Sequence, residues 1–375
     1  MNELFGESHI HHMILSNRFV RSATWEGMAA TDGAVTPKLC RTMAALATGG
    51  VGLIISSHAY VSPEGQAGPW QLGIYKDDLI AGLKEMTAAV HVAGGKIVAQ
   101  LAHAGQAAAA AVSGRTPLVV SDFDGLMNSP RREMTAPDIQ HIITAFADAA
   151  ARARSSGFDG VQIHAAHGYL LNQFLSPAFN RRRDDYGGPL ANRTRIIIDV
   201  LRAVRETVGS DFPILVKMNG QDFIENGLTL ADSLQAAELL AAFGVDAIEL
   251  SGGIVGSRKL MPSRTGINSV ESEAYFREEA RAFKKRIPVP LILVGGLRSL
   301  EVAEGLMEEG AADYISMCRP FIREPGLINR WKAGDRRKST CLSDNQCFTP
   351  GREGKGIYCV VLEREQAKKK ESRND

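Results

Sequence analysis

Several features that would assign a protein to a broad class are missing from this sequence. No run approaches the ~20 apolar residues of a membrane span, so we expect no membrane partner. The N-terminus, MNELFGESHIHHMILSNRF, lacks the basic, apolar and small-residue pattern of a signal peptide, which favours the cytoplasm. Five cysteines are too few and too scattered for a disulfide framework. With 43 basic and 42 acidic residues the net charge is +1, which does not favour a nucleic-acid partner.

A nucleotide-binding domain of the Rossmann type is not expected either, because no G-x-G-x-x-G follows a strand in a βαβ context. What the chain of 375 residues does contain is short apolar runs that alternate with amphipathic segments. That alternation indicates repeated βα units and a parallel sheet. We therefore predict an α/β protein with one domain, a single (β/α)8 TIM barrel over residues 1–335. Residues 336–375 are predicted to be an extension with cysteines and a charged, disordered tail.

The apolar runs predict eight strands, and the segments between them predict the outer helices. The strands are expected at Phe19–Thr24, Gly52–Ser57, Lys96–Leu101, Gly160–His164, Ile214–Met218, Ala247–Leu250, Leu291–Val294 and Tyr314–Met317. The helices are expected at Pro37–Ala47, Asp77–Val92, Pro137–Ser156, Leu190–Val208, Leu230–Phe243, Ser272–Arg286 and Leu300–Glu309. Reactive residues of such barrels lie at the carboxyl ends of the strands.

The ends of the seventh and eighth strands suggest a phosphate site. Gly295 and Gly296 follow the seventh strand, and Arg319 follows the eighth. Glycine lets backbone N–H groups approach phosphate oxygens, and a guanidinium can add a bidentate contact. The alternative is that the glycines merely turn the chain and Arg319 pairs with a carboxylate.

Other strand ends carry side chains that could act on a ligand. Gln100 ends the third strand and Lys217 the fifth, and either could be a plain polar rim residue. His164, His167 and Tyr169 follow the fourth strand, where two imidazoles and a phenol could bind an oxyanion and deliver a proton. A structural role is the common alternative. We expect no metal at the histidines, because no carboxylate or cysteine stands at a helpful offset.

The stretch HAAHGYLLNQFLSPAFNRRRDDYGG resembles the Old Yellow Enzyme family of FMN-dependent ene-reductases, over roughly residues 1–335. The resemblance implies FMN as cofactor and NADH or NADPH as co-substrate. It implies that His164 and His167 bind the carbonyl oxygen of the substrate and that Tyr169 protonates its α-carbon. The cofactor-binding residues it implies are Ser22, Ala23, Thr24, His58, Gln100, Lys217, Gly295, Gly296, Cys318 and Arg319.

The sequence departs from the family pattern in two places. Trp25 stands where the family usually has Thr or Cys near the flavin, and we expect it to line the substrate pocket. Cys341, Cys347 and Cys359 resemble the [4Fe–4S] motif of 2,4-dienoyl-CoA reductases, but Asp344 replaces the second cysteine and one residue is lost. Three thiolates at altered spacing seldom hold such a cluster, so we do not expect an intact one.

These observations predict an FMN-dependent enzyme that takes hydride from NAD(P)H and reduces the C=C bond of α,β-unsaturated carbonyl compounds in ping-pong order. A dienoyl-CoA-reductase-like or desaturating FMN dehydrogenase is the first alternative. A non-redox phosphate-binding lyase, with Lys217 as a Schiff-base lysine, is the second. By resemblance we also expect a homo-oligomer.

Overall fold

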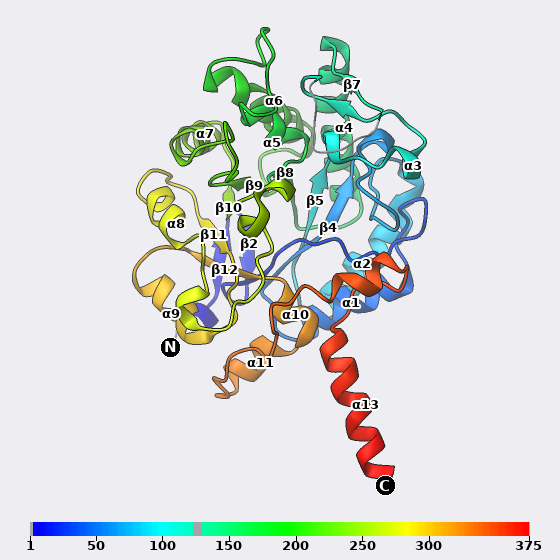
Figure 1. Cartoon of the computed structure of the whole chain (residues 1–375), viewed down its shortest axis with the longest axis vertical. Coiled ribbons are helices and arrows are strands. Elements are labelled where there is room, and N and C mark those ends of the chain that lie inside the picture. The colour runs from blue at the N-terminus through cyan, green and yellow to red at the C-terminus, as the bar shows by residue number, and fades with distance from the viewer. Residues whose placement is uncertain (1–2, 123–129, 375) are drawn as a thin grey trace.

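The computed structural model describes residues 3–122 and 130–374, and its centre is a closed barrel of eight parallel strands. The strand order is β10-β11-β12-β3-β4-β5-β8-β9 (Figure 1). The single TIM barrel predicted from the alternating apolar runs is therefore confirmed. The barrel strands are β3 Phe19–Arg21, β4 Leu53–Tyr60, β5 Ile97–Ala102, β8 Gly160–Ala165, β9 Ile214–Asn219, β10 Ala247–Ser251, β11 Leu291–Val294 and β12 Tyr314–Met317.

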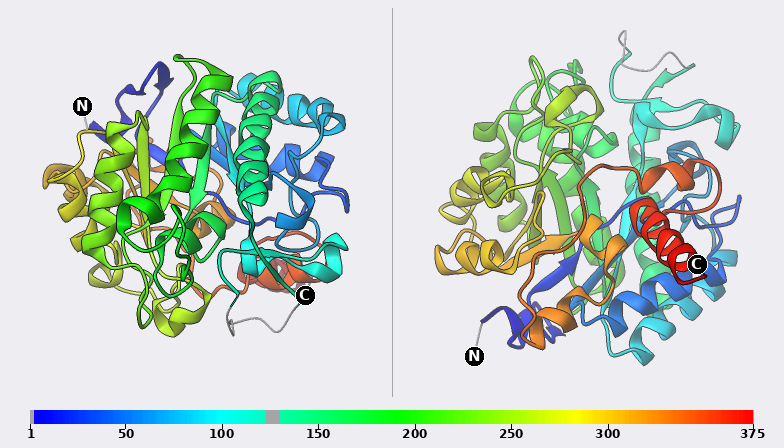
Figure 2. Two further views of the ribbon diagram at one scale, coloured as in Figure 1. Left: turned by 90° about the horizontal axis from the view of Figure 1, so that it is seen from above. Right: turned by 60° about the horizontal axis from the view of Figure 1, so that its bottom comes forward.

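Helices surround the strands as an outer layer (Figure 2). Two of them begin at a threonine cap: Thr36 accepts a hydrogen bond from the backbone N–H of Leu39, and Thr135 forms a capping box with Asp138. The outer helices are α1 Pro37–Thr48, α2 Ile80–Val92, α4 Ala136–Ser155, α6 Leu190–Val208, α7 Leu230–Ala242, α8 Arg277–Lys284 and α9 Leu300–Glu308.

Most elements lie within one or two residues of their predicted bounds, and α2 begins three residues later than predicted, after a 3-10 turn. Three further elements differ by three residues or more. Strand β3 ends at Arg21 rather than Thr24, and the segment that follows returns Glu26 to Arg21, with which it forms a buried ion pair. Strand β4 is longer than predicted and contains His58. Helix α8 begins five residues later than Ser272. The carboxylate of Glu273 accepts hydrogen bonds from the backbone of the β11–α9 loop and holds that segment outside the helix.

A small antiparallel hairpin lies at the amino-terminal end of the barrel, made by β1 Ser8–Ile10 and β2 Met13–Leu15. Its side chains Ile10, Met13 and Leu15 are buried, and they pack with interior residues of the barrel strands, including Val20 and Leu53. The hairpin closes this end of the barrel with apolar side chains. A polar site can therefore open only at the opposite end, where the carboxyl ends of the strands lie. Nothing in the alternating pattern predicts this hairpin.

Two connections of the barrel contain additional elements. Between β5 and α4 lie α3 Ala110–Ser113 and a small sheet of β6 Leu118–Val119 and β7 Arg132–Glu133. Between β8 and α6 lies α5 Leu170–Leu175. Short 3-10 turns occupy Glu3–Phe5, Pro63–Gly65, Asp77–Leu79, Gly105–Ala107, Val255–Leu260 and Val270–Ser272.

The C-terminal extension is more ordered than predicted. After α10 Arg319–Arg323 and α11 Leu327–Lys332, the chain passes through α12 Phe348–Arg352 and ends in α13 Val360–Asn374, which extends from the barrel in Figure 1. The expected disordered tail is thus a helix, since Glu, Arg, Gln, Ala and Lys all favour that conformation. A 2.6 Å ion pair between Arg323 and Glu365 ties its first turns to the body. Across the described ranges, no helix is long and apolar enough to cross a membrane.

Candidate active site

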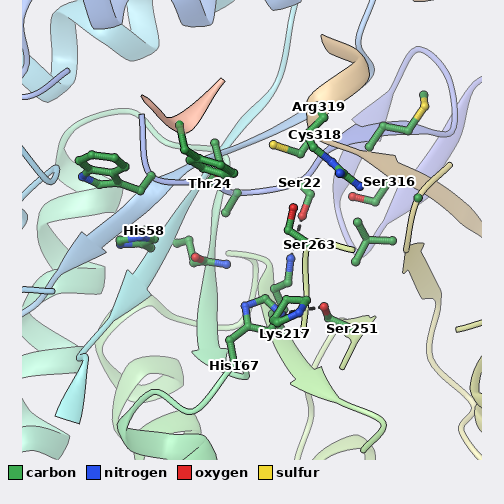
Figure 3. Close-up of a pocket in the computed structure, with 18 of the residues that line it drawn as sticks. Ser22, Thr24, His58, His167, Lys217, Ser251, Ser263, Ser316, Cys318 and Arg319 are labelled. Carbon is green, nitrogen blue, oxygen red and sulfur yellow. Dashed lines mark hydrogen bonds between the residues drawn. The ribbon is translucent and has the colours of Figure 1, made fainter. Parts of the chain in front are cut away.

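A cavity of about 480 Å³ opens at the carboxyl ends of the barrel strands. Every site residue predicted from the sequence lines it except Gly295, which lies directly beside the lining residue Gly296. Figure 3 shows Lys217 and His167 on one side of this cavity and Thr24, Cys318 and Arg319 on the other. The predicted residues that line it are Ser22, Ala23, Thr24, Trp25, His58, Gln100, His164, His167, Tyr169, Lys217, Gly296, Cys318 and Arg319.

Three of these residues form one aromatic group at the end of β8. The ring centroid of His164 lies 5.3 Å from that of His167 and 4.8 Å from that of Tyr169. His167 Nε2 is 2.7 Å from the Oγ of Ser251, whereas the buried Nδ1 of His164 has no hydrogen-bond partner in the described structure. A buried polar atom is usually hydrogen-bonded, and a ligand group or a water molecule in the cavity would satisfy this nitrogen.

The turn that presents Tyr169 is held by buried amides. His167 and Gly168 both have left-handed backbone, with φ of 63° and 80°. The side chain of Asn172 accepts a 2.6 Å hydrogen bond from the Gly168 N–H, and Gln173 donates a 2.6 Å bond to the Gly168 carbonyl. The side chain of Asn219, at the end of β9, accepts from the His167 N–H at 3.2 Å. This strained turn is fixed before any ligand arrives.

Burial sets the protonation of the group. It lowers the pKa of His164 and of His167 well below the ordinary imidazole value, and the charge of Lys217 adds to the effect. Burial also lowers the pKa of His58 to about 4. The pKa of the Tyr169 phenol is raised, again by burial. At neutral pH the site therefore holds neutral imidazoles and a protonated phenol, all of which can donate hydrogen bonds.

A buried ion pair lies at the floor of the cavity. Lys217 Nζ lies 3.2 Å from Glu249 Oε1 and donates a 2.7 Å hydrogen bond to Ser22 Oγ. The Glu249 carboxylate also accepts bonds from Gln162 (2.9 Å) and Ser316 (2.9 Å). Gln100 donates to Gln162 at 2.7 Å, so the floor is one hydrogen-bonded network.

Glu249 and Gln162 were not among the residues singled out from the sequence. The available signal was a lone carboxylate inside the apolar run Ala247–Leu250, at a position that the barrel register pairs with Lys217. A charge within a buried strand requires a partner, and the adjacent strand supplies it. Gln162 interrupts the run of β8 in the same way.

The residues at the ends of β11 and β12 suit a bound phosphate. Gly296 has a φ of 73°, and a Cβ there would lie 2.7 Å from Tyr275 Cε1. Gly295 has a φ of 146°, and its Cβ would lie 3.0 Å from Phe276. Only glycine fits this close approach of the backbone to the rings. Arg319 is buried beside the two glycines, and its Nη1 donates to the carbonyl of Arg264 (2.7 Å) and to Asn345 Oδ1 (2.9 Å).

The C-terminal extension supplies part of the cavity wall, which the sequence did not predict. The cavity is lined by Ser343, Phe348 and Arg352 of the extension and by Trp25 of the barrel. A Cβ on Gly351 would lie 3.0 Å from Cζ3 of the Trp25 ring, so the ring packs directly on α12. The indole Nε1 of Trp25 donates to the Pro69 carbonyl at 3.1 Å. Trp25 is thus part of the junction between the barrel and the extension.

The three cysteines of the extension also meet. Cys341, Cys347 and Cys359 surround a cavity of about 20 Å³, close to the size of one water molecule. All three are free thiols, and burial raises the pKa of Cys347 to about 12. The Arg323 guanidinium donates to the Cys359 sulfur at 3.5 Å. In the part of the chain that the structure describes, no group of His, Cys, Asp or Glu is placed to hold a metal ion.

Comparison with known proteins gives consistent results. The model of the NADH:flavin oxidoreductase / NADH oxidase family matches residues 3–338. The chain is 36% identical over 366 residues to an NADH oxidase of Thermoanaerobacter brockii, covering 96% of this chain and 55% of that protein. This chain therefore spans about half the length of that relative.

Two solved structures share the whole barrel. A 2-naphthoyl-CoA reductase in complex with 2-naphthoyl-CoA superposes with a TM-score of 0.89 at 27% identity, covering 96% of this chain and 56% of that one. An old yellow enzyme homologue from Zymomonas mobilis gives a TM-score of 0.76 at 28% identity, covering 91% and 95% of the two chains.

Proposed function

Because the chain belongs to the NADH:flavin oxidoreductase / NADH oxidase family, the Old Yellow Enzyme family, we propose that it reduces the C=C bond of α,β-unsaturated carbonyl compounds. The family is FMN- and NAD(P)H-dependent, and its members are oxidoreductases. The proposal adds the substrate class and the ping-pong order. The observation that carries it is the grouping of His164, His167 and Tyr169 on one wall of the cavity.

The residues present fit FMN. The glycine pair beside Tyr275 and the buried Arg319 suit the phosphate, and Gln100, Lys217 and Ser22 supply amide, ammonium and hydroxyl groups for a polar ring. When bound, FMN supplies the carrier that accepts a hydride from the nicotinamide and passes a hydride to the alkene. Since the Lys217 ammonium is paired with Glu249, the floor of the site adds little net charge.

The two histidines would hold the substrate by its carbonyl oxygen. As neutral imidazoles they donate N–H groups toward an oxygen on which negative charge develops, and this stabilises the transition state. The Nδ1 of His164 has no partner in the described structure, and the Nε2 of His167 contacts the Ser251 hydroxyl. A bound ligand would therefore decide which nitrogen of each ring carries the proton. Donors at the oxygen make the β-carbon of the alkene electrophilic.

Tyr169 would then deliver the proton to the α-carbon. Its raised pKa keeps the phenol protonated at neutral pH, and its ring lies directly against that of His164. A positioned proton donor of this kind typically contributes ~10²–10⁴ in rate. Its proton is replaced from solvent after each turnover.

A second candidate is reduction of an unsaturated acyl thioester. The similarity to a 2-naphthoyl-CoA reductase favours it, because the same donors could bind a thioester carbonyl. The lyase alternative considered for the sequence is wrong. The family is one of oxidoreductases, and Lys217 is held by Glu249 and Ser22 rather than free to attack a carbonyl.

A visible spectrum of the purified protein tests the proposal. We expect oxidised-flavin bands that bleach on anaerobic addition of NADH or NADPH and return on addition of 2-cyclohexenone. Bleaching without return would reject enones as substrates, and return only with an unsaturated acyl-CoA would favour the second candidate.

A further inference from the structure

The walls of the main cavity carry cationic side chains, and no carboxylate is among its described lining residues. Of the described residues that line it, three are cations and none is an aspartate or glutamate. A cation in such a wall attracts anions wherever no carboxylate already neutralises it. The three cations are Lys217, Arg319 and Arg352.

Two of these cations already have partners. Lys217 pairs with Glu249 at 3.2 Å and bonds to Ser22. Arg319 is buried beside the glycines of the phosphate site and is held by Asn345 and the Arg264 carbonyl. Both belong to the proposed cofactor site, where Arg319 would bind the phosphate and Lys217 would contact the polar ring.

Arg352 has no such partner. Its guanidinium forms no hydrogen bond or ion pair with any residue in the described ranges, and the adjacent Glu353 pairs instead with Lys355 at 2.9 Å. Unpaired arginines are common on protein surfaces, so exposure alone means little. Arg352 differs because it stands in the wall of the main cavity, where Trp25 and Phe348 add apolar surface.

The element that carries Arg352 is fixed in place. Gly351 packs against the Trp25 ring, with Cβ-to-ring distances of 3.0 and 3.3 Å, and the Ile357 N–H donates to the Glu26 carbonyl at 2.8 Å. On the other side, Asn345 donates to the Ser263 carbonyl at 2.8 Å. These contacts anchor the segment on both sides of the cavity, so the backbone that carries Arg352 is in place before a ligand binds.

We infer that Arg352 is a specificity residue that binds an anionic group of the ligand that enters above the cofactor site. The favoured ligand is an enone whose apolar body lies against Trp25 and Phe348 and whose carboxylate or phosphate reaches the guanidinium. A phosphate of the nicotinamide dinucleotide has the same chemistry and enters the same cavity. The inference rests on the proposed function, which it deepens by naming the charge of the substrate.

The test compares Arg352→Gln with wild-type holoenzyme on two enones, 2-cyclohexenone and 4-oxocyclohex-2-ene-1-carboxylate. We expect the KM for the carboxylated enone to rise about ten- to a hundredfold, as for loss of a hydrogen bond to a charged group, with 2-cyclohexenone within about twofold. Arg352→Lys should restore part of the loss. Arg41→Gln, an exposed and unpaired arginine outside this cavity, is the matched control and should change neither KM.

The same variants separate the two sources of the anion. A rise in the KM for NADH or NADPH, with both enones unchanged, would support Arg352 as a phosphate contact of the nicotinamide dinucleotide. No change in any of these values would overturn the inference. Loss of FMN from Arg352→Gln would also overturn it, because the arginine would then belong to the cofactor site.

A binding measurement keeps the inference separate from the proposed function. Calorimetric titration of holoenzyme with 4-oxocyclohexane-1-carboxylate and with cyclohexanone needs no turnover. Tighter binding of the carboxylate in wild type, lost in Arg352→Gln, would support the inference even if no enone is reduced. Equal binding of the two compounds by wild type would contradict it.

Discussion

The two walls of the cavity differ in origin and in content. One wall is built from the ends of barrel strands and carries His164, Tyr169 and Lys217, and the other is built from the C-terminal extension and carries Phe348 and Arg352. The strand-end wall contains the groups that can donate protons or hold charge in a buried network. The extension wall contributes one aromatic ring, one hydroxyl group and the cation of Arg352, which has no partner among the described residues. Under the proposed function, the chemistry and the choice of ligand would reside on different parts of the chain.

The largest expected effect concerns the strand-end wall. Tyr169→Phe removes the proton donor and keeps the ring that packs on His164. We expect flavin reoxidation by 2-cyclohexenone to slow by ~10²–10⁴, while reduction by NADPH changes little. Anaerobic stopped-flow absorbance of each half-reaction measures this. A similar loss in both half-reactions would show that Tyr169 shapes the cavity instead of supplying a proton.

The next prediction tests the buried floor of the same wall. Glu249→Leu leaves the Lys217 ammonium without its partner in a buried network, and we expect the free energy of unfolding to fall by about 3–5 kcal/mol. Glu249→Gln keeps the shape and most of the hydrogen bonds, so its loss should be smaller. Urea denaturation of both variants measures the difference. Equal stability of Glu249→Leu and wild type would mean that the ion pair is not formed.

Alanine substitutions at two glycines separate an effect on FMN binding from the general cost of a side chain at positive φ. Gly296 and Gly310 both have positive φ, but only a Cβ at Gly296 meets other atoms, at 2.7 Å from Tyr275. We therefore expect Gly296→Ala to weaken FMN binding at least about tenfold, a cost of ~1.4 kcal/mol. Gly310→Ala should lose stability by about 1 kcal/mol and retain FMN. Flavin fluorescence during dialysis measures retention, and equal retention in the two variants would place the phosphate elsewhere.

A smaller effect is expected where the two walls meet. Gly351→Ala brings a Cβ to 3.0 Å from the Trp25 ring and from Ile357, whereas Gly326→Ala points into open space. We expect Gly351→Ala to lower stability by ~1–3 kcal/mol by overpacking and to leave the 2-cyclohexenone rate within about threefold. Thermal unfolding and the stopped-flow rate check both parts. A large loss of rate would make the extension part of the catalytic machinery.

The smallest expected effect is the change in the flavin reoxidation rate with pH. Burial moves the pKa of His164 and His167 below the ordinary value and that of Tyr169 above it. An acid limb due to imidazole protonation therefore moves below about pH 6.5, and an alkaline limb due to phenol ionisation moves above about pH 10. The reoxidation rate should vary by less than about twofold between pH 6.5 and 9. A limb inside that range that disappears in Tyr169→Phe would contradict the protonated phenol.

The strand-end wall could be predicted because the barrel itself dictates it. Apolar runs such as Leu291–Val294 and Tyr314–Met317 fix the strands, and in a parallel barrel their carboxyl ends must converge. His164, Lys217 and Arg319 stand at such ends and line the cavity as expected. Their individual roles remain predictions.

The extension wall could not be predicted because it depends on contacts between distant parts of the chain. The packing of Gly351 on Trp25 joins residues more than 300 positions apart, and no local pattern reports it. For the same reason, the local sequence did not predict the β1–β2 hairpin or the turn after β3, where Arg21 pairs with Glu26. The helical tail α13 was missed for another reason: a high charge content was taken as disorder, although its residues favour helix.

The most direct test of the account is the destination of the hydride. Wild-type enzyme would reduce 2-cyclohexenone with nicotinamide nucleotide deuterated at C4, in ordinary water, and the product would be analysed by NMR. Donors at the carbonyl oxygen make the β-carbon the hydride acceptor and leave the α-carbon to Tyr169, so we predict deuterium at the β-carbon. Deuterium at the α-carbon, or an unreduced enone, would contradict the assignment of His164, His167 and Tyr169.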